Sequence, residues 1–514
     1  MSAQWTRRLR QISQAVSFGL FMFLFVQAVY LGRSPLPSDL FYRLDPLIAA
    51  TAILAGRAIK AGLLYSLINL AASLVFGRVW CGWLCPFGTF LEWVSPRKPA
   101  KRVAVPDRWR GAKYILLAVL LTAAALGNQT LVFLDPVSIL TRSMTTVLWP
   151  GLRYLVFGLE SVLYTLEPLW PLLDGLNRSI LLPVFQGIES VFIASLPAAL
   201  MLLIIAGLNL IAPRFWCRYV CPLGGLLGFF SRRAIVRRTV SPDCISCDLC
   251  AKICPTGTID SQQGYASDPA ECTVCHDCSA ACPVNAISFK RHPGNWGNPE
   301  KRDYDPDRRQ VLLGMAGAIG GVALAGIEPT QRRQPERMIR PPGAVLTNFT
   351  ALCMRCGECV RVCPTQGLQP SLMEGGWQNV FTPRLVPRLG YCSYSCSACI
   401  QVCPAGAIPP ISIEQKQTVP IGLASINTDR CLPWAYQTIC SVCEEMCPLP
   451  DKAIKLEDTE VLNENGEALH FLRPVVVRDL CIGCGICEYH CPVGGEAAIQ
   501  VQTLPGSDVF LAGI

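Results

Sequence analysis

The cysteines of this 514-residue chain, 28 in number, fall into tight local groups. Most groups repeat the spacing Cys-x-x-Cys-x-x-Cys-x-x-x-Cys-Pro, which first occurs between Cys244 and Cys254. Disulfide frameworks do not repeat this spacing, and zinc ribbons lack the third close cysteine and the trailing proline. Three thiolates at this spacing wrap one corner of a four-iron cubane. The cysteines therefore predict 4Fe–4S clusters and one-electron transfer.

The fourth cysteine of such a loop ligates the other cluster of a two-cluster unit. This rule predicts two clusters in the middle of the chain, one held by Cys244, Cys247, Cys250 and Cys282 and one by Cys272, Cys275, Cys278 and Cys254. It predicts four more toward the C-terminus, held by Cys353, Cys356, Cys359 and Cys403, by Cys392, Cys396, Cys399 and Cys363, by Cys431, Cys440, Cys443 and Cys491, and by Cys481, Cys484, Cys487 and Cys447. The longer first gaps after Cys392 and Cys431 are interpreted as loop insertions.

A further quartet lies in two copies of the motif Arg-x-Trp-Cys-x-x-x-Cys-Pro, and it consists of Cys81, Cys85, Cys217 and Cys221. Two cysteines at i and i+4 share one face of a helix, so two related pairs can present four thiols to one point. This quartet is a candidate seventh cluster site. The alternatives are a thiol or disulfide pair, or a site that contacts quinone or the ferredoxin unit.

A haem-attachment motif is formally present at Cys272-Thr273-Val274-Cys275-His276. It is nested inside a cluster loop, which favours the iron–sulfur interpretation. The chain has only four histidines, so neither bis-histidine haems nor a histidine-rich metal site is supported.

Long apolar stretches predict the elements that carry these motifs. The mean hydropathy is +0.36 and 16% of residues are charged, which suggests a membrane part joined to a water-soluble part. Apolar stretches at residues 12–31, 61–79, 114–126 and 191–211 predict four spans. Because the Arg-x-Trp-Cys motif repeats, we expect the spans to form two related helical hairpins. Basic residues flank the spans, at Arg7, Arg8, Arg10, Arg97, Lys98, Lys101, Arg102, Arg108, Arg110, Lys113, Arg232, Arg233, Arg237 and Arg238, and predict a cytoplasmic N-terminus.

The pair Arg308-Arg309, followed by a Gly/Ala-rich apolar stretch to Ile327, is typical of a twin-arginine export signal placed in mid-chain. It predicts a fifth single span, and the alternative is a short buried helix. The predicted fold is an α-helical membrane bundle with α+β bacterial-ferredoxin-like domains on both sides. The predicted domains are a four-span membrane domain (1–235), a cytoplasmic two-cluster ferredoxin domain (236–295), a linker with the fifth span (296–330) and a periplasmic four-cluster ferredoxin domain (331–514).

These motifs carry a family resemblance. Residues 1 to about 290 resemble the membrane quinol dehydrogenase ferredoxin subunit of periplasmic nitrate reductase systems (NapH type) in the spans, the Cys-x-x-x-Cys-Pro repeats and the ferredoxin pair. From about residue 303 the chain resembles the periplasmic ferredoxin subunit (NapG type) in the twin-arginine segment, the stretch from Ile339 to Ala344 and the four cysteine groups. The resemblance predicts a fusion of the two. Similar modules occur beside methylamine and nitrous-oxide systems.

The resemblance implies that the chain oxidises menaquinol or ubiquinol and passes electrons to a periplasmic redox enzyme or cytochrome. The implied setting is the bacterial inner membrane, with the C-terminal domain in the periplasm, in contact with lipid and the quinone pool and within a multi-subunit complex. No nucleic-acid partner is expected, because the net charge of +8 is concentrated beside apolar stretches. The alternative is a maturation or reactivation factor for a periplasmic metalloenzyme.

Two acidic residues are candidate quinol proton acceptors. Asp45 and Asp135 each precede a proline and an apolar turn, in segments 36–60 and 131–190, which are predicted to lie at the outer face. These segments are expected either to form helices at the membrane interface or to pack as loops over the bundle. The alternative role for both aspartates is helix capping.

Overall fold

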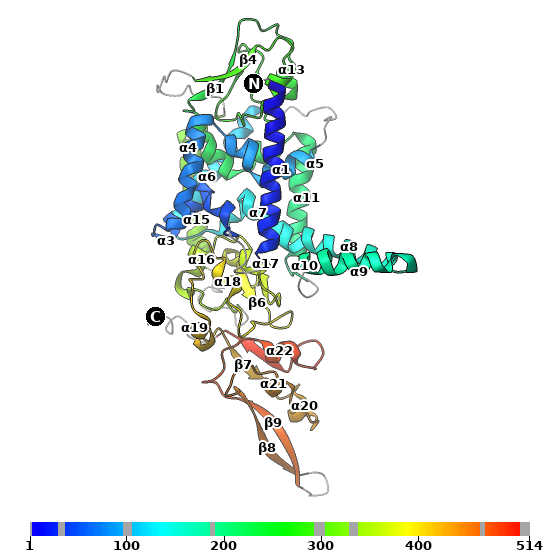
Figure 1. Cartoon of the computed structure of the whole chain (residues 1–514). Helices are drawn as coiled ribbons and strands as arrows, with labels where there is room; N and C mark the ends of the chain where they lie inside the picture. The colour runs from blue at the N-terminus through cyan, green and yellow to red at the C-terminus, as the bar shows by residue number, and fades with distance from the viewer. Residues whose placement is uncertain are drawn as a thin grey trace. The chain divides into compact units, whose positions relative to one another are not determined.

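The computed structural model describes residues 3–28, 36–95, 105–185, 191–291, 304–327, 338–462 and 468–503 (Figure 1). The chain divides into two compact units. Unit one comprises residues 1–143 and 197–324, and unit two comprises residues 144–196 and 325–514. Four of the basic flanking residues, Arg97, Lys98, Lys101 and Arg102, lie outside the described residues.

Helices occupy the four apolar stretches in which spans are predicted. They are α1 (Ala3–Gln27), α4 (Ser66–Phe76) after the 3-10 turn η1 (Ala61–Tyr65), α6 (Ala112–Ala125) and α11 (Ser195–Ile211). Within the described ranges, α1 is the one helix that has both the length and the apolar composition needed to cross a membrane. The segments 61–76 and 195–211 are apolar but shorter. The four-span bundle therefore stays a prediction.

Helix α1 begins earlier than expected and is not a plain apolar anchor. Arg10, Gln14 and Ser17 form a buried polar stripe along one face of it. Arg10 is 1% exposed and donates from Nη1 to Glu92 at 3.0 Å, and Gln14 donates to the carbonyl oxygen of Gly82 at 3.0 Å. The basic side chain of Arg10 can lie buried on this helix because unit one supplies carboxylate partners for it.

Two short helices, α3 (Pro46–Gly56) and α7 (Pro136–Ser143), follow the Asp-Pro motifs within the predicted outer segments. Proline is favoured at the first position of a helix, and an aspartate before it can cap the free backbone N–H groups. Asp45 accepts from the N–H of Leu47 at 2.8 Å, and Asp135 accepts from the N–H of Ser138 at 2.9 Å. Both aspartates are fully buried within unit one, and their place at the outer side of a membrane stays a prediction.

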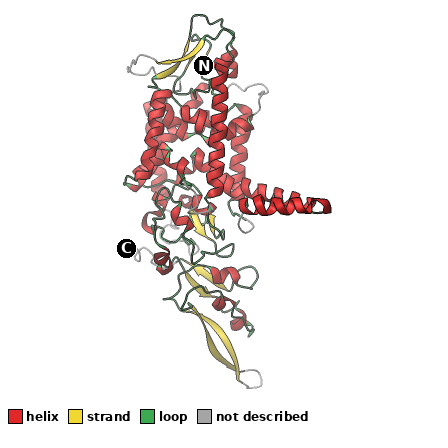
Figure 2. Ribbon diagram, in the orientation of Figure 1, coloured by secondary structure: helices red, strands yellow, loops and turns green. Residues whose placement is uncertain are grey.

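The rest of unit one includes a small α+β domain (Figure 2). In this domain β1 (Val236–Val240) pairs antiparallel with β4 (Ile287–Arg291), and β2 (Ile259–Asp260) pairs with β3 (Ala266–Ser267). The remaining helices and turns of unit one are α2 (Leu40–Arg43), the π-turn η2 (Trp80–Leu84), α5 (Pro86–Val94), η3 (Asp107–Gly111), η4 (Thr130–Leu134), the π-turn η8 (Trp216–Val220), α12 (Pro222–Ser231), α13 (Leu249–Ile253) and α14 (Asp277–Ala280).

The twin-arginine segment forms helix α15 (Arg308–Ile327). Gly314 lies against α6, where an added Cβ would stand 3.1 Å from Ile115 and 3.3 Å from Val119. Just before the helix, Tyr304 stacks on Tyr114 with ring centroids 6.5 Å apart. The apolar stretch is therefore helical, as predicted, and α15 packs on α6 within unit one.

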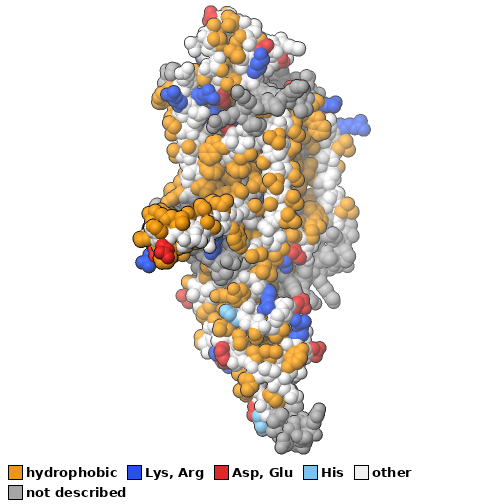
Figure 3. Space-filling model, turned by 90° about the vertical axis from the view of Figure 1, so that its right-hand side faces the viewer, with side chains coloured by type: hydrophobic (Ala, Val, Ile, Leu, Met, Phe, Trp, Pro, Cys, Tyr) orange, Lys and Arg blue, Asp and Glu red, His pale blue; other side chains and the backbone are white. Residues whose placement is uncertain are grey.

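Unit two begins with a helical hairpin, in a segment for which either interfacial helices or packed loops are expected. Helix α8 (Trp149–Leu163) is followed by α9 (Trp170–Leu176) and α10 (Leu182–Val184), and Phe185 packs back on Trp149 with centroids 4.9 Å apart. The hairpin exposes many large apolar side chains, among them Leu155 (67% exposed) and Leu172 (69% exposed). Figure 3 shows hydrophobic side chains gathered over the helical parts of the molecule.

The cysteine-rich part of unit two is built from short elements around a shared apolar core. Three antiparallel pairs organise it: β5 (Leu368–Pro370) with β6 (Pro383–Leu385), β7 (Leu423–Ile426) with β10 (Ile499–Gln502), and β8 (Ile454–Leu462) with β9 (Ala468–Val476). The other elements are η5 (Met144–Leu148), η6 (Glu167–Leu169), η7 (Asn177–Leu181), η10 (Leu346–Asn348), α16 (Phe349–Leu352), α17 (Glu358–Arg361), η11 (Trp377–Asn379), α18 (Ala398–Gln401), α19 (Ile413–Thr418), α20 (Leu432–Ala435), α21 (Val442–Glu445) and α22 (Ile486–His490).

Candidate functional site

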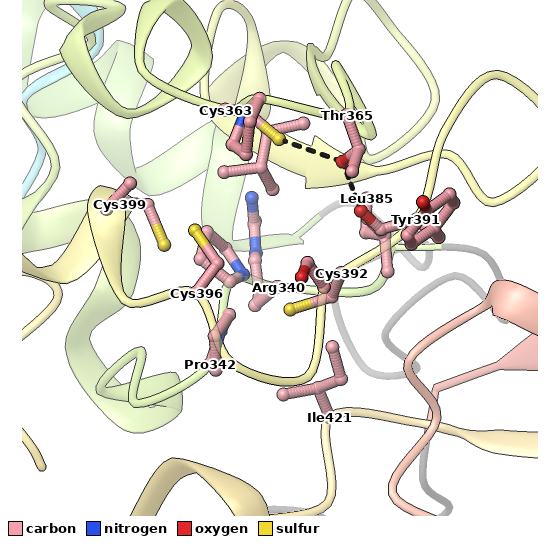
Figure 4. Close-up of a pocket in the computed structure, with 15 residues that line it drawn as sticks. Arg340, Pro342, Cys363, Thr365, Leu385, Tyr391, Cys392, Cys396, Cys399 and Ile421 are labelled. Carbon is pink, nitrogen blue, oxygen red and sulfur yellow. Dashed lines mark hydrogen bonds between the residues drawn. The ribbon is translucent and has the colours of Figure 1, made fainter. Parts of the chain in front are cut away.

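The structure brings the cysteines together in the sets that the spacing rule predicts. Each site takes the name of the first cysteine of its set. The Cys353, Cys392, Cys431 and Cys481 sites lie in unit two, and the Cys81, Cys244 and Cys272 sites lie in unit one. Figure 4 shows the sulfur atoms of the Cys392 site around a common cavity, with Arg340 and Ile421 among the other residues that line it. The four cysteines of the Cys353 site line a second cavity.

The other two sites of unit two are assembled across the longer sequence gaps. Cys431 lies within electrostatic reach of Cys440 and Cys491. Cys484 likewise lies near Cys481 and Cys447. The loop insertion after Cys431 therefore does not remove this cysteine from its set.

Contacts between sites give the four sites of unit two a linear order. Cys359 of the Cys353 site lies near Cys399 of the Cys392 site. The Cys392 site touches the Cys481 site directly, because the N–H of Cys392 donates to the carbonyl oxygen of Cys484 at 2.8 Å. Cys487 of the Cys481 site lies near Cys443 of the Cys431 site. The order is thus Cys353, Cys392, Cys481, Cys431.

The tightly spaced loops share an unusual backbone. The residues on both sides of the middle cysteine have positive φ, as with Ser246 (54°) and Asp248 (60°) around Cys247, or Val274 (53°) and His276 (60°) around Cys275. A β-branched residue such as Val274 pays a steric penalty there, and strain of this kind persists where function requires it. Left-handed residues direct successive N–H groups into a concavity that suits an anion or a cluster sulfide. Cys356 is flanked in the same way by Arg355 and Gly357, and Cys484 by Gly483 and Gly485, all four with positive φ.

The Cys244 and Cys272 sites adjoin each other in the α+β domain of unit one. Cys244, Cys247, Cys250 and Cys282 line one cavity. Cys278 of the Cys272 site lies near both Cys254 and Cys250, so it stands between the two sites. The ring of His276 packs against Phe289, with centroids 4.2 Å apart.

The Cys81 site forms at the point where the two sequence repeats meet. Cys221 lies within electrostatic reach of Cys217, Cys81 and Cys85. The expectation that each pair shares one helix face is wrong in detail. Cys81 lies in the π-turn η2, and Cys85 has an extended backbone and caps α5, as proline at the next position requires. The Cys85 sulfur accepts from the N–H of Gly88 at 3.4 Å.

Two buried arginines cross between the repeats at the Cys81 site. Arg78 donates from Nη2 to the carbonyl oxygen of Cys217 at 3.3 Å, and Arg214 donates from Nη1 to the carbonyl oxygen of Cys81 at 3.1 Å. Both arginines are 1% exposed. The two positive charges would offset the negative charge of a cluster bound by thiolates, whereas burial alone favours the neutral thiol form. The sequence repeat already contains both arginines, but their role follows only from the structure.

A buried carboxylate ties the α+β domain to the helices. Glu271 is 1% exposed, and its Oε2 lies 2.5 Å from Lys113 Nζ, 3.1 Å from Arg78 Nη1 and 3.8 Å from Arg110 Nη1. Burial alone would raise the pKa of Glu271, but the charges of Lys113, Arg78 and Arg110 outweigh it and hold the pKa below its usual range. No sequence pattern singled out Glu271, because its partners are 158 to 193 residues away.

Asp45 and Asp135 meet within unit one, although 90 residues separate them in the sequence. Each carboxyl group faces the other, and each keeps one oxygen, Oδ2 of Asp45 and Oδ1 of Asp135, without a hydrogen-bond donor. Two adjacent buried carboxyl groups cannot both be ionised, so the pair holds a shared proton. Asp135 also lies within electrostatic reach of Cys85. The aspartates therefore cap helices and also form a carboxyl pair beside the Cys81 site.

The Cys392, Cys244 and Cys353 sets fit four-iron clusters in ligand type and number, since the four thiols of each line one cavity. In the described part of the chain, no three His, Cys, Asp or Glu side chains are close enough to hold a single metal ion.

Comparisons with known proteins support iron–sulfur binding in three parts of the chain. Family models described as a 4Fe-4S binding domain match residues 61–103 with 195–241 and residues 474–495, and a 4Fe-4S dicluster domain matches residues 352–407. The first match contains all four cysteines of the Cys81 site. The chain is an iron–sulfur electron-transfer protein. No solved structure matches it.

Similar proteins of known name define the family of this chain more closely. The methylamine utilization ferredoxin-type protein MauM of Methylorubrum extorquens is 36% identical over 203 residues, which cover 38% of this chain and 89% of the relative. The ferredoxin-type protein NapG of Escherichia coli is 36% identical over 204 residues, which cover 38% of this chain and 86% of the relative. MauM of Paracoccus denitrificans is 35% identical over 214 residues, with 39% and 86% covered. The chain belongs to the family of ferredoxin-type iron–sulfur proteins that includes NapG and MauM.

Proposed function

We propose that the chain is a membrane quinol dehydrogenase that passes electrons from the quinol pool to a periplasmic redox enzyme. The observation that carries this proposal is the carboxyl pair Asp45–Asp135 beside the Cys81 site. Oxidation of a quinol releases two protons and two electrons, so its site needs a proton acceptor next to an electron acceptor. The carboxyl pair supplies the first, because it can take up one proton besides the one it shares, and the four thiols supply ligands for the second.

Seven clusters are proposed, six in ferredoxin-type sites and a seventh in the Cys81 site. The quartet Cys81, Cys85, Cys217 and Cys221 would hold the seventh, and Arg78 and Arg214 would offset its negative charge. A bound cluster accepts one electron at a time and so splits the two-electron oxidation of quinol into single steps. The match of a 4Fe-4S binding domain over both repeats supports this assignment.

The membrane orientation is part of the proposal. The basic residues around α1, α6 and α12 favour a cytoplasmic N-terminus and a cytoplasmic two-cluster domain. Helix α15 would return the chain across the bilayer, which would put the ferredoxin sites of unit two in the periplasm. The exposed apolar surfaces of α1, α4 and α11 suit contact with lipid.

The linear order of sites in unit two supports a conduit. Electrons would pass along the Cys353, Cys392, Cys481 and Cys431 sites, which contact one another in that order. The acceptor would be a periplasmic reductase or cytochrome in a multi-subunit complex. The resemblance to NapG-type subunits favours a nitrate-reductase-like system, which we propose, and the name of MauM points to methylamine utilization as the other candidate.

The test is reduction of the purified full chain in lipid nanodiscs by a menaquinol analogue, followed by the bleaching of cluster absorbance. Fast bleaching that continues catalytically when an artificial acceptor is added supports the dehydrogenase. Clusters that stay oxidised with excess quinol would contradict it and would favour a maturation role.

A further inference from the structure

The cysteine loop of the Cys81 site is seated directly on the cluster loop of the Cys272 site. A Cβ added at Gly82 would lie 2.1 Å from the carbonyl oxygen of Thr273, so only glycine allows this approach. Next to it, the Trp83 indole Nε1 donates to the carbonyl oxygen of Val274 at 2.9 Å. The loop that contains Cys81 and the loop that contains Cys275 are therefore in direct contact. This closeness suits electron exchange between clusters bound by the two loops.

Charged side chains hold the same two loops in register. Arg214, which donates to Cys81, also lies within electrostatic reach of Cys275. Arg10 of α1 pairs at 3.4 Å with Asp277, which lies in the second loop between Cys275 and Cys278, and at 3.0 Å with Glu92. Packing and charge therefore fix one loop against the other.

From the Cys272 site, contacts continue to the Cys244 site. Cys278 lies near Cys250, and helices α13 and α14, which carry these two cysteines, pack against each other. The Cys81, Cys272 and Cys244 sites thus form a second linear series within unit one.

The Cys244 site ends at the surface of unit one. Cys247 is exposed. Around the cavity that it lines, Ile245 is 59% exposed, Leu249 44% and Val284 40%. We call these three apolar residues with Cys247 the Cys247 patch. A cluster ligand at the surface within an apolar rim is suited to close approach of another redox protein.

We propose that the Cys247 patch is a second electron port, at which a soluble one-electron carrier of the ferredoxin or flavodoxin class exchanges electrons with the Cys244 site. The carrier loses one electron per encounter, and the cluster held by Cys244, Cys247, Cys250 and Cys282 gains it. The series of sites then conducts this electron to the Cys81 site. This inference rests on the proposed function in one respect, namely that quinone reacts at the Cys81 site.

The size of the Cys247 patch decides the kind of partner. Stable subunit interfaces engage about 20–30 residues on each side, whereas electron-transfer encounters are small and short-lived. The three apolar side chains around Cys247 form a small surface, which matches a short-lived electron-transfer encounter. The occupant is therefore a mobile carrier instead of a permanent subunit.

The experiment mixes the full chain in nanodiscs with a reduced bacterial 4Fe–4S ferredoxin and follows the rate of cluster bleaching by stopped flow. Ile245→Asp and Leu249→Asp should lower the second-order rate at least about tenfold, while iron content and the rate with menaquinol stay unchanged. The matched control is Leu472→Asp, which alters an equally exposed leucine of unit two (53%) and should leave the rate unaltered. A rate that Ile245→Asp and Leu249→Asp leave unchanged, or the absence of any reduction by the ferredoxin, would overturn the port.

A second variant tests the internal path. Trp83→Phe removes the hydrogen bond to Val274 but keeps an aromatic ring. It should weaken the magnetic interaction between the Cys81 and Cys272 sites in EPR spectra and slow the re-oxidation of ferredoxin-reduced inner clusters by added menaquinone. Unchanged spectra and rates would refute the path. If menaquinol fails to reduce unit two while ferredoxin still reduces unit one, the proposed function fails and the port stands.

Discussion

Arg78 donates to the backbone carbonyl oxygen of Cys217, which lies 139 residues further along the chain, at 3.3 Å. The donor belongs to one copy of the Arg-x-Trp-Cys motif and the acceptor to the other, and Arg214 makes the reciprocal bond to Cys81. The two repeats are therefore held together by the arginine of each motif, and the four thiols converge between them.

Removing one arginine charge should lower the midpoint potential of the Cys81 site. Positive charge beside a cluster favours the reduced, more negative form, so Arg214→Met should shift the potential downward by about 60 mV or more, which corresponds to about 1.4 kcal/mol for one electron. Arg214→Lys keeps the charge and should shift it far less. The measurement is an EPR-monitored redox titration, and equal potentials in both variants would exclude an electrostatic role.

Replacing either member of the carboxyl pair should slow quinol oxidation. Asparagine keeps the side-chain oxygen that caps α3 or α7, so Asp45→Asn and Asp135→Asn should fold. Each should lower kcat about 10²- to 10⁴-fold, the usual contribution of a general base. Asp39→Asn is the control, because Asp39 is also buried but pairs with Arg43. Full quinol activity in both variants would leave the pair with a capping role only.

The Glu271 cluster should be a main support of the α+β domain. Glu271→Gln leaves Lys113, Arg78 and Arg110 buried without their anion, which typically costs about 3–5 kcal/mol. Glu374→Gln breaks a partly exposed pair with Arg384 and should cost about 1 kcal/mol or less. Thermal unfolding of the two variants compares them, and similar Tm values would contradict the prediction.

Glu92 should make stability depend on pH in the acidic range. Burial alone would raise the pKa of Glu92, but Arg214 and Arg10 lower it to about 2. A carboxylate with a lowered pKa stabilises the folded state above its unfolded pKa of 4.5, and this contribution is lost as the pH falls toward about 2. It amounts to on the order of 3 kcal/mol.

Glu92→Gln should therefore be less stable than the wild type at pH 6, and the difference should shrink steadily below pH 4.5. Glu457→Gln, at an exposed position, provides the control. A difference in unfolding free energy that is constant from pH 6 to pH 3 would rule out this charge contribution.

Much of this arrangement could be predicted from the sequence, and the reasons are local. Cysteine spacing assigns ligands because loop and cluster geometry are set within a few residues, so the Cys392 set forms as expected. The Asp-Pro motifs marked helix starts for the same reason. By contrast, the contact between Gly82 and Thr273 and the partners of Glu271 join residues more than 150 positions apart. No local pattern encodes such pairings.

The extent of α1 shows the same limit. Its apolar composition predicts a helix from residue 12, but the helix begins at Ala3 because Arg10 and Gln14 find buried partners in α5 and η2. Those partners could not be inferred without the fold. The burial of Asp45 and Asp135 likewise depends on how α3 and α7 pack, which hydropathy does not report.

The central claim is that quinol delivers electrons to a chain of clusters that includes one in the Cys81 site. One sample tests it most directly: the purified full chain, assayed for iron and acid-labile sulfide and then reduced by a menaquinol analogue. Seven four-iron clusters predict about 28 irons per chain, with rapid reduction by quinol. About 24 irons would leave the Cys81 site without a cluster. Full iron content with clusters that quinol leaves oxidised would contradict the account.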